Sequence, residues 1–254
     1  MEIQEKGHRL LKNALEILDY VADSPEPITF NNLKQQFKLS KSSIYNLLQT
    51  MLLTGYLERD SAGHYSIGIR CFRTGSAFRV SNPFERRAKE VVEGINTACK
   101  ETVHFAVLQD TDVVYIYKFD SIHALRIYSQ VGKKIPAHTT AIGKAMLSGY
   151  SDEELRSFYM ETKLVSLTPK SITSFRVLLE QMHEVRRTSI AYEQEESTPD
   201  VKCVAVPIMN SKKIPVAGIS VAFPVYREDK EVEKVIPLLL KAKKDLEDLY
   251  AMYE

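Results

Sequence analysis

The stretch that decides the fold is residues 28–68, ITFNNLKQQFKLSKSSIYNLLQTMLLTGYLERDSAGHYSIG. Thr29 and Ser40 each precede a run of helix-forming residues, and their hydroxyls are suited to cap a helix N-terminus. Leu33 and Phe37 are spaced to share the inner face of the first short helix. The stretch therefore predicts two short helices joined by a tight turn.

A β-ribbon is expected directly after the second helix. Gly55 ends that helix, and residues 56–59 and 64–67 alternate between apolar and polar side chains as strands do. The four residues at 60–63, Asp-Ser-Ala-Gly, form a hairpin turn between them. Helix, turn, helix and ribbon in this order predict a winged helix-turn-helix, which places one helix in a DNA groove.

The helix expected over residues 41–54 has a polar face suited to read DNA. Asn and Gln side chains pair with adenine edges, whereas Ser, Tyr and Lys side chains hold phosphates. The same polar side chains would also suit an ordinary solvent-facing helix. The predicted DNA contacts, on this helix and around it, are Thr29, Ser40, Lys41, Ser42, Ser43, Tyr45, Asn46, Gln49, Arg59 and His64.

Charge is distributed unevenly along the chain. Residues 31–80 contain seven Lys and Arg but only two Asp and Glu, whereas residues 1–30 contain six acidic and three basic residues. The basic excess lies on the winged segment, where phosphate contacts would be needed. The whole chain has a formal net charge of +1, so the local excess supports DNA binding without proving it.

Length and composition indicate a two-domain cytoplasmic protein. A chain of 254 residues suits one domain of ordinary size and a smaller one. No apolar run is long enough to span a bilayer, and residues 1–12 are too charged for a signal peptide. The three cysteines are scattered, which is typical of reduced thiols in the cytosol.

Beyond the winged segment, the pattern predicts an α+β domain in which helices flank an antiparallel sheet. Strands are expected at residues 102–109, 113–120, 125–131, 201–209 and 215–223, with a loop at 132–136. Helices are expected at residues 8–21, 69–80, 84–100, 138–149, 152–159, 171–188 and 229–253. Pro237 must kink the last helix, unless that helix begins later.

Motifs for catalysis or metal binding are missing. Gly143-Lys144 fails the phosphate-loop pattern, because His138 stands where a glycine is needed and Ala145 where Ser or Thr is needed. The Cys and His residues lack the spacing of metal ligands, although His104 and Cys203 could meet in space. We therefore expect no catalytic residues, no metal and no cofactor.

Two segments of the second domain leave more than one interpretation open. The acidic residues 193–196 could serve acid–base chemistry, or they could form a solvated loop. The helix start at residues 138–144 could bind a ligand carboxylate through exposed amides, or it could be an ordinary capped helix.

Several blocks of sequence resemble the IclR family of bacterial transcriptional regulators, over nearly the full length of the chain. In the winged segment the matching blocks are residues 39–44 (LSKSSI) and 55–57 (GYL). In the second domain they are residues 101–104 (ETVH), 136–145 (PAHTTAIGKA), 191–196 (AYEQEE), 203–208 (CVAVPI) and 218–221 (GISV).

The resemblance implies a GAF-like effector domain that binds a small organic acid, in a protein that forms dimers or dimers of dimers. Two positions depart from the family pattern, because many relatives have arginine where Asn46 stands and serine where Ala222 stands. The family's ligand pocket would fall here on Thr140, Ala141, Ile142, Glu193, Val201, Cys203, Ser220 and Ala222.

The expected protein is thus a ligand-responsive regulator, a repressor of a catabolic operon, that binds double-stranded DNA and a small carboxylic, keto or sugar acid. We expect a winged domain at residues 1–68, a linker helix at 69–82 and an effector and oligomerisation domain at 83–254. One alternative is an enzyme acting on an organic acid, with an N-terminal domain that docks to a partner. Another is an architectural DNA-binding protein with a vestigial pocket.

Overall fold

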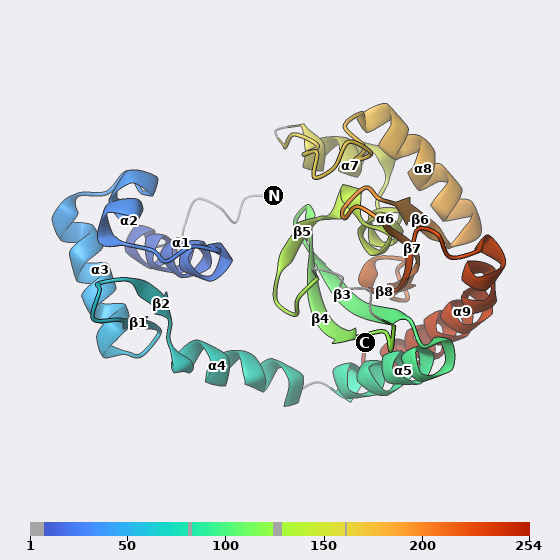
Figure 1. The fold of residues 1–254 in the computed structure, drawn as a ribbon, viewed down its shortest axis with the longest axis horizontal. Coiled ribbons are helices and arrows are strands. Elements are labelled where there is room, and N and C mark those ends of the chain that lie inside the picture. The colour runs from blue at the N-terminus through green and yellow to red at the C-terminus, as the bar shows by residue number, and fades with distance from the viewer. Residues whose placement is uncertain (1–7, 81–82, 124–128, 161) are drawn as a thin grey trace. The chain divides into compact units, whose positions relative to one another are not determined.

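The computed structural model describes residues 8–80, 83–123, 129–160 and 162–254 (Figure 1). The chain divides into two compact units, Met1–Asn82 and Pro83–Glu254. Each unit buries its own cluster of apolar side chains, so each has an independent hydrophobic core.

The first unit is a winged helix-turn-helix followed by a helix, as the sequence predicts. It contains α1 (Arg9–Asp23), α2 (Phe30–Gln36), α3 (Lys41–Leu53), β1 (Leu57–Arg59), β2 (Tyr65–Ile67) and α4 (Ile69–Val80). The two strands pair antiparallel as the wing. The bounds of α4 coincide with the helix expected at residues 69–80, and residues 81 and 82 of the expected linker lie outside the described residues.

Side-chain caps fix where the two short helices begin. The Thr29 hydroxyl accepts a hydrogen bond from the Asn32 amide, and the Asn32 side chain accepts one from the Thr29 amide, which forms a capping box. The Ser40 hydroxyl accepts a hydrogen bond from the Ser43 amide at the start of α3. Ile44 and Leu48 are fully buried, so α3 turns its apolar face into the core and its polar face outward.

The second unit is built on one antiparallel sheet of strands β5-β4-β3-β8-β7-β6, in that order. Its strands are β3 (Thr102–Gln109), β4 (Asp112–Phe119), β5 (Lys134–Pro136), β6 (Ala191–Gln194), β7 (Val201–Met209) and β8 (Pro215–Pro224). Its helices are α5 (Pro83–Cys99), η1 (Ala137–Thr139, a 3-10 turn), α6 (Ala141–Leu147), α7 (Asp152–Tyr159), α8 (Phe175–Thr188) and α9 (Asp229–Ala251). This arrangement confirms the predicted α+β class.

Helices cover both faces of the sheet (Figure 1). α5 and α9 pack on one face, where alternate residues of β8 such as Ile219 and Val221 are buried. α6, α7 and α8 form a second core with the opposite face. Gly218 is where α6 comes closest, because a Cβ atom added there would crowd the Ile142 side chain. The intervening positions of β8, including Ser220, therefore face α6.

Three predicted elements between β4 and α7 differ in the structure. The helix expected over residues 138–149 is present only as α6, because Thr140 has an extended backbone that separates η1 from α6. The loop expected at 132–136 instead contains β5, which pairs with the start of β4. Of the strand expected at 125–131, residues 125–128 lie outside the described residues, and residues 129–131 form no strand.

The starts of two later helices also bear on the predictions: one differs from the predicted start, and the other decides between two alternatives. α8 begins at Phe175 rather than at residue 171, because the Ser171 hydroxyl accepts hydrogen bonds from two preceding amides and bonds the Glu196 carbonyl. α9 begins at Asp229 with Pro237 inside it, so a later start is wrong. Pro237 removes one backbone donor from that helix.

The two glycines in helices of the second unit offer a matched test of how closely α6 packs against η1. A Cβ atom at Gly143 would overlap the backbone of Ala137, whereas one at Gly94 on α5 would meet no atom within 4 Å. We expect Gly143→Ala to lower the free energy of unfolding by about 1–3 kcal/mol through overpacking. Gly94→Ala should raise it by about 0.5–1 kcal/mol through helix propensity. Urea denaturation measures both, and equal stability of the two variants would contradict the close approach of η1 and α6.

Candidate functional site

The second unit encloses a cavity between α6 and the sheet, with a volume of about 240 Å³. The lining residues come from β3, β4, β6, β7, β8, the start of α6, the segments around β5 and after β6, and the segment that precedes α8. The structure brings together here all the residues predicted for the ligand pocket: Thr140, Ala141, Ile142, Glu193, Val201, Cys203, Ser220 and Ala222.

Strand register explains why these residues meet. Glu193 on β6 is paired with Cys203 on β7, and Cys203 is paired with Ala222 on β8, so the three form one row across the sheet. Residues two apart on a strand face the same side, which places Val201 and Ser220 beside that row. The cavity floor is therefore set by the alternation of three antiparallel strands.

The start of α6 forms the opposite wall. Thr140 caps this helix, because its hydroxyl accepts a hydrogen bond from the Gly143 amide at 3.0 Å and donates to the Ala137 carbonyl at 3.4 Å. The amides of Ala141 and Ile142 precede the first intrahelical hydrogen bond. The wall thus presents backbone donors beside an apolar surface.

Several lining residues are absent from the predicted pocket. The most deeply buried polar residue among them is His104 on β3, which is 3% exposed and lies opposite Ser220 in the β3–β8 pairing. The period-two pattern of residues 102–109 carries the signal for it, since Thr102, His104 and Ala106 must share a face. The other unpredicted lining residues are Tyr115, Ser129, Lys133, Lys134, Ile135, Pro136, Leu167, Ser197 and Thr198.

His104 is uncharged at neutral pH. Burial lowers its pKa to about 3, and the positive charge of Lys118 acts in the same direction. Its Nε2 atom lies 2.7 Å from the Ser129 hydroxyl, and its ring lies 4.9 Å from that of Tyr115. The imidazole can therefore hydrogen-bond a ligand, but it supplies no charge to the cavity.

Glu193 is the most deeply buried carboxyl group of the cavity, at 2% exposed. Its Oε1 atom accepts hydrogen bonds from the Glu196 amide at 2.7 Å and the Ser197 amide at 3.1 Å. Burial raises the pKa of this carboxyl group, and the backbone donors oppose that rise. Burial likewise raises the pKa of the Cys203 thiol, with the Glu193 charge acting in the same direction.

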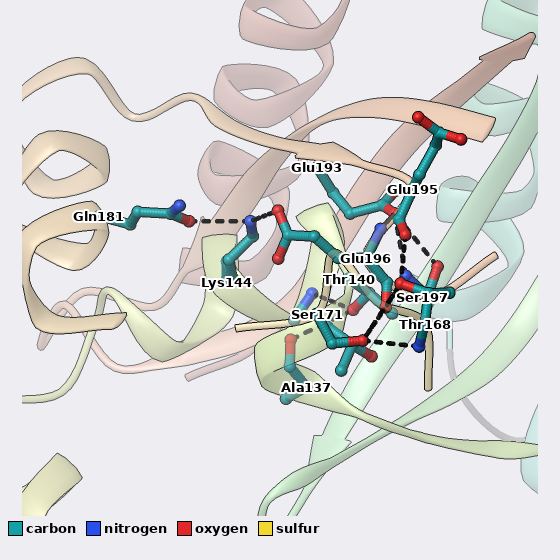
Figure 2. Close-up of polar contacts among 12 residues, drawn as sticks. Ala137, Thr140, Lys144, Thr168, Ser171, Gln181, Glu193, Glu195, Glu196 and Ser197 are labelled. Carbon is teal, nitrogen blue, oxygen red and sulfur yellow. Dashed lines mark hydrogen bonds and ion pairs between the residues drawn. The ribbon is translucent and has the colours of Figure 1, made fainter. Parts of the chain in front are cut away.

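A buried ion pair holds the segment that follows β6 (Figure 2). Lys144 on α6 is 1% exposed, and its Nζ atom lies 2.7 Å from Glu196 Oε1 and 2.8 Å from Gln181 Oε1 on α8. The hydroxyls of Thr168 and Ser171 donate to the carbonyls of the same segment, each at 2.5 Å. These contacts fix the position of Ser197 and Thr198 on the cavity wall.

The acidic residues 193–196 form neither a solvated loop nor an exposed acid–base pair. Glu193 and Glu196 are buried, and Glu195 is paired with Lys170. No three His, Cys, Asp or Glu residues are grouped to hold a metal ion in the parts of the chain that the structure describes. The Cys203 thiol lacks the lowered pKa that a nucleophile needs.

The predicted DNA-reading face lies on the outward side of α3. Lys41, Ser42, Tyr45 and Asn46 are exposed, and Tyr45 retains 54% of its accessible surface. Gln49 is half-buried, one helical turn beyond Tyr45. Of the three serines, Ser40 is occupied in capping, with its hydroxyl 3.0 Å from that of Ser42 and 2.8 Å from that of Ser43.

The remaining predicted DNA contacts are engaged within the first unit. The Thr29 side chain belongs to the capping box of α2. On the wing, the Arg59 guanidinium lies 5.4 Å from the ring centroid of Tyr65. The Asp60 carboxyl group accepts a hydrogen bond from the His64 amide at 2.8 Å, and His64 Nδ1 lies 3.0 Å from Asp60 Oδ2. The amide bond first, and the side-chain contact second, lower the pKa of Asp60. On the ribbon, Arg59 is exposed and His64 is half-buried.

Comparison with known proteins agrees with both parts of this description. The IclR helix-turn-helix domain matches residues 10–61, and the C-terminal domain of bacterial transcriptional regulator IclR matches residues 80–247. The chain is 32% identical over 214 residues to the HTH-type transcriptional regulator KdgR of Dickeya chrysanthemi, covering 83% of this chain and 70% of that protein. It is 28% identical over 240 residues to the transcriptional repressor IclR of Escherichia coli K12, covering 93% and 88%.

A solved IclR homolog from Microbacterium hydrocarbonoxydans, complexed with 4-hydroxybenzoate, shares the fold. Its TM-score is 0.77 at 20% identity, over 94% of this chain and 98% of that one. The helix-turn-helix unit and the cavity-bearing α+β unit, with these matches, define a bacterial transcriptional regulator. The chain belongs to the IclR family.

The described helices include none that is both long enough and apolar enough to cross a lipid bilayer. The longest of them, α9, contains charged residues throughout its length.

Removing the buried cation should expose the role of the ion pair. Lys144→Met leaves Glu196 buried without its partner, so we expect a loss of about 3–5 kcal/mol of unfolding free energy. Burial raises the pKa of Glu196 and Lys144 opposes that rise, so the pKa rises further in the variant. Because the folded state then binds the proton more tightly, stability should recover as pH falls through that raised pKa.

Lys170→Met is the matched control, because Lys170 pairs with Glu195 at the surface and retains 57% of its side-chain exposure. It should cost less than about 1 kcal/mol, with little change in pH dependence. Chemical denaturation between pH 5 and 8 distinguishes the two variants. Equal losses for both would contradict a structural role for the buried pair.

Proposed function

We propose that this protein is a cytoplasmic repressor of a catabolic operon, released from or retained on its operator by a small organic acid. The observation that carries the proposal is the cavity, in which strands, α6 and the segment after β6 bring polar groups together with apolar walls. The exposed polar face of α3 in the same chain supplies the DNA-binding half.

The chemistry of the cavity supports a small ligand with a carboxylate and further polar groups. Apolar walls at Ile142 and Val201 would cover a short carbon skeleton. The amides at the start of α6 would hold the carboxylate, and Ser220 would bond an oxygen on the skeleton. The 4-hydroxybenzoate bound to the Microbacterium homolog is also a carboxylate, which agrees with this class. We propose that the ligand is bound without turnover.

DNA recognition would come from two copies of the winged unit. Asn46 and Gln49 would contact base edges, while Lys41, the α3 serines, Tyr45 and the wing residues Arg59 and His64 would hold phosphates. A dimer, or a dimer of dimers, would place two α3 helices in successive major grooves of a near-palindromic site. Leu11 and Leu15 on α1 and Phe72 on α4 are exposed apolar side chains that such pairing would cover.

Effector binding can change DNA affinity only through different affinities for two arrangements of the protein. A ligand in the cavity would favour one spacing of the paired α3 helices over another. The helix α4, which ends the winged unit, would carry that difference.

Blocking the cavity should abolish the ligand response without loss of DNA binding. Ile142→Trp fills the wall that faces the sheet, and Ser220→Ala removes a hydroxyl from the floor. For Ile142→Trp we expect an acid that raises the melting temperature of the wild type to have no effect at the same concentration. For Ser220→Ala, which loses one hydrogen bond to the acid, we expect roughly tenfold weaker binding and a smaller rise in melting temperature. Ile122→Trp, an exposed isoleucine away from the cavity, is the control and should respond normally. Unchanged ligand affinity in both cavity variants, measured by calorimetry, would refute the assignment.

The two amide side chains of α3 should determine sequence specificity. Asn46→Ala and Gln49→Ala should each cost about 1–3 kcal/mol of specific binding if they form bidentate base contacts. Lys41→Ala should instead weaken binding to all sequences and reduce the slope of log K against log salt by about one.

Lys241→Ala, an exposed lysine of α9, is the matched control and should change neither specificity nor slope. Fluorescence anisotropy with specific and scrambled duplexes over a salt series measures all four variants. Specific affinity unchanged in both amide variants at fixed salt would show that another face of the unit reads DNA.

A further inference from the structure

His104 lies between two serine hydroxyls inside the cavity. Its Nε2 atom is 2.7 Å from Ser129 Oγ, and its Nδ1 atom is 3.5 Å from Ser220 Oγ. The three side chains are each at most 5% exposed, and all three line the cavity. They come from β3, β8 and the segment before β5, so the fold rather than the local sequence assembles them.

This row of three groups can carry its hydrogen bonds in either direction. A neutral imidazole has one donor and one acceptor nitrogen, and the two tautomers exchange these roles. A serine hydroxyl can rotate to donate or to accept. With the proton on Nδ1, His104 donates to Ser220, and the Ser220 O–H is free to donate elsewhere. With the proton on Nε2, Ser220 donates to Nδ1, and its oxygen is free to accept.

Ser220 differs in this respect from Thr140, whose hydroxyl belongs to the α6 side of the cavity. The Thr140 hydroxyl is committed on both sides, because it donates to the Ala137 carbonyl and accepts from the Gly143 amide. Backbone groups cannot exchange donor for acceptor, so the polarity of Thr140 is fixed. The contact of Ser220 with His104 is long, at 3.5 Å, and leaves Ser220 able to bond a ligand oxygen.

We infer that His104 is a specificity-determining residue that allows Ser220 to bind either a hydroxyl or a keto oxygen on the carbon skeleton of the acid. This inference rests on the proposed function of the cavity. A keto oxygen accepts from Ser220 in the Nδ1–H tautomer, and a hydroxyl donates to Ser220 in the Nε2–H tautomer. An acid with a methylene group at that position leaves Ser220 without this partner and binds more weakly.

The test uses the full chain and acids that differ at one carbon. Suitable sets are glutarate with its 2-hydroxy and 2-oxo forms, butanoate with its 2- and 3-hydroxy and oxo forms, and 2-deoxygluconate with gluconate and 2-ketogluconate. Calorimetry should show the hydroxy and keto members of a binding set within about tenfold of each other. Both should bind roughly tenfold or more tightly than the member that lacks the oxygen.

His104→Phe keeps a planar ring but removes both ring nitrogens. In this variant the preference for the oxygenated acids should fall below about threefold, while the affinity for the deoxy acid is retained. His123→Phe replaces an exposed histidine outside the cavity and should keep the wild-type preference. A preference that survives in His104→Phe would overturn the inference.

A second readout needs no variant at the site. Nitrogen-15 NMR of histidine-labelled protein distinguishes the two neutral tautomers, and His104 should occupy opposite tautomers in the hydroxy-acid and keto-acid complexes. The same tautomer in both complexes, or equal affinity of the wild type for oxygenated and deoxy acids, would overturn this inference alone. Failure of every acid to bind would overturn the proposed carboxylate ligand as well.

Discussion

The buried cation of Lys144 is the constraint on which the ligand cavity depends. An ammonium group that is 1% exposed is stable only with a partner, and Glu196 and Gln181 supply it from the segment after β6 and from α8. The ion pair therefore ties α6 to that segment. The Glu193 carboxyl group accepts hydrogen bonds from the Glu196 and Ser197 amides. One network of contacts therefore fixes both the cavity wall and the Glu193 carboxyl group.

Burial shifts the pKa values of the ionisable groups that line the cavity. The same desolvation that lowers the pKa of His104 raises that of Glu193, so both groups are biased toward their uncharged forms. Neutral hydrogen-bonding groups can select a ligand by its pattern of donors and acceptors. Ligand selection agrees with a family whose members are transcriptional regulators.

Local sequence patterns predict only those parts of the fold that depend on residues close together in the chain. The caps at Thr29 and Ser40 and the period-two strands predict the winged unit and four of the six strands of the sheet. The break at Thr140 was missed, because the extended residue lies inside a run that favours helix. The contact of His104 with Ser129 depends on strand pairing and on the path of the chain between β4 and β5, which no local pattern encodes.

We propose that ligand binding and DNA binding are coupled in this protein. Because such coupling is reciprocal, it can be measured as an effect of the operator on ligand affinity. An operator fragment can be selected with the purified protein, and an acid can be found by thermal shift. The dissociation constant of that acid is then measured on the free protein and on the protein–operator complex. We expect the two values to differ by the factor by which the acid changes operator affinity, typically about 5–150-fold. Equal ligand affinity in both states would contradict the coupling and leave a cavity that does not regulate DNA binding.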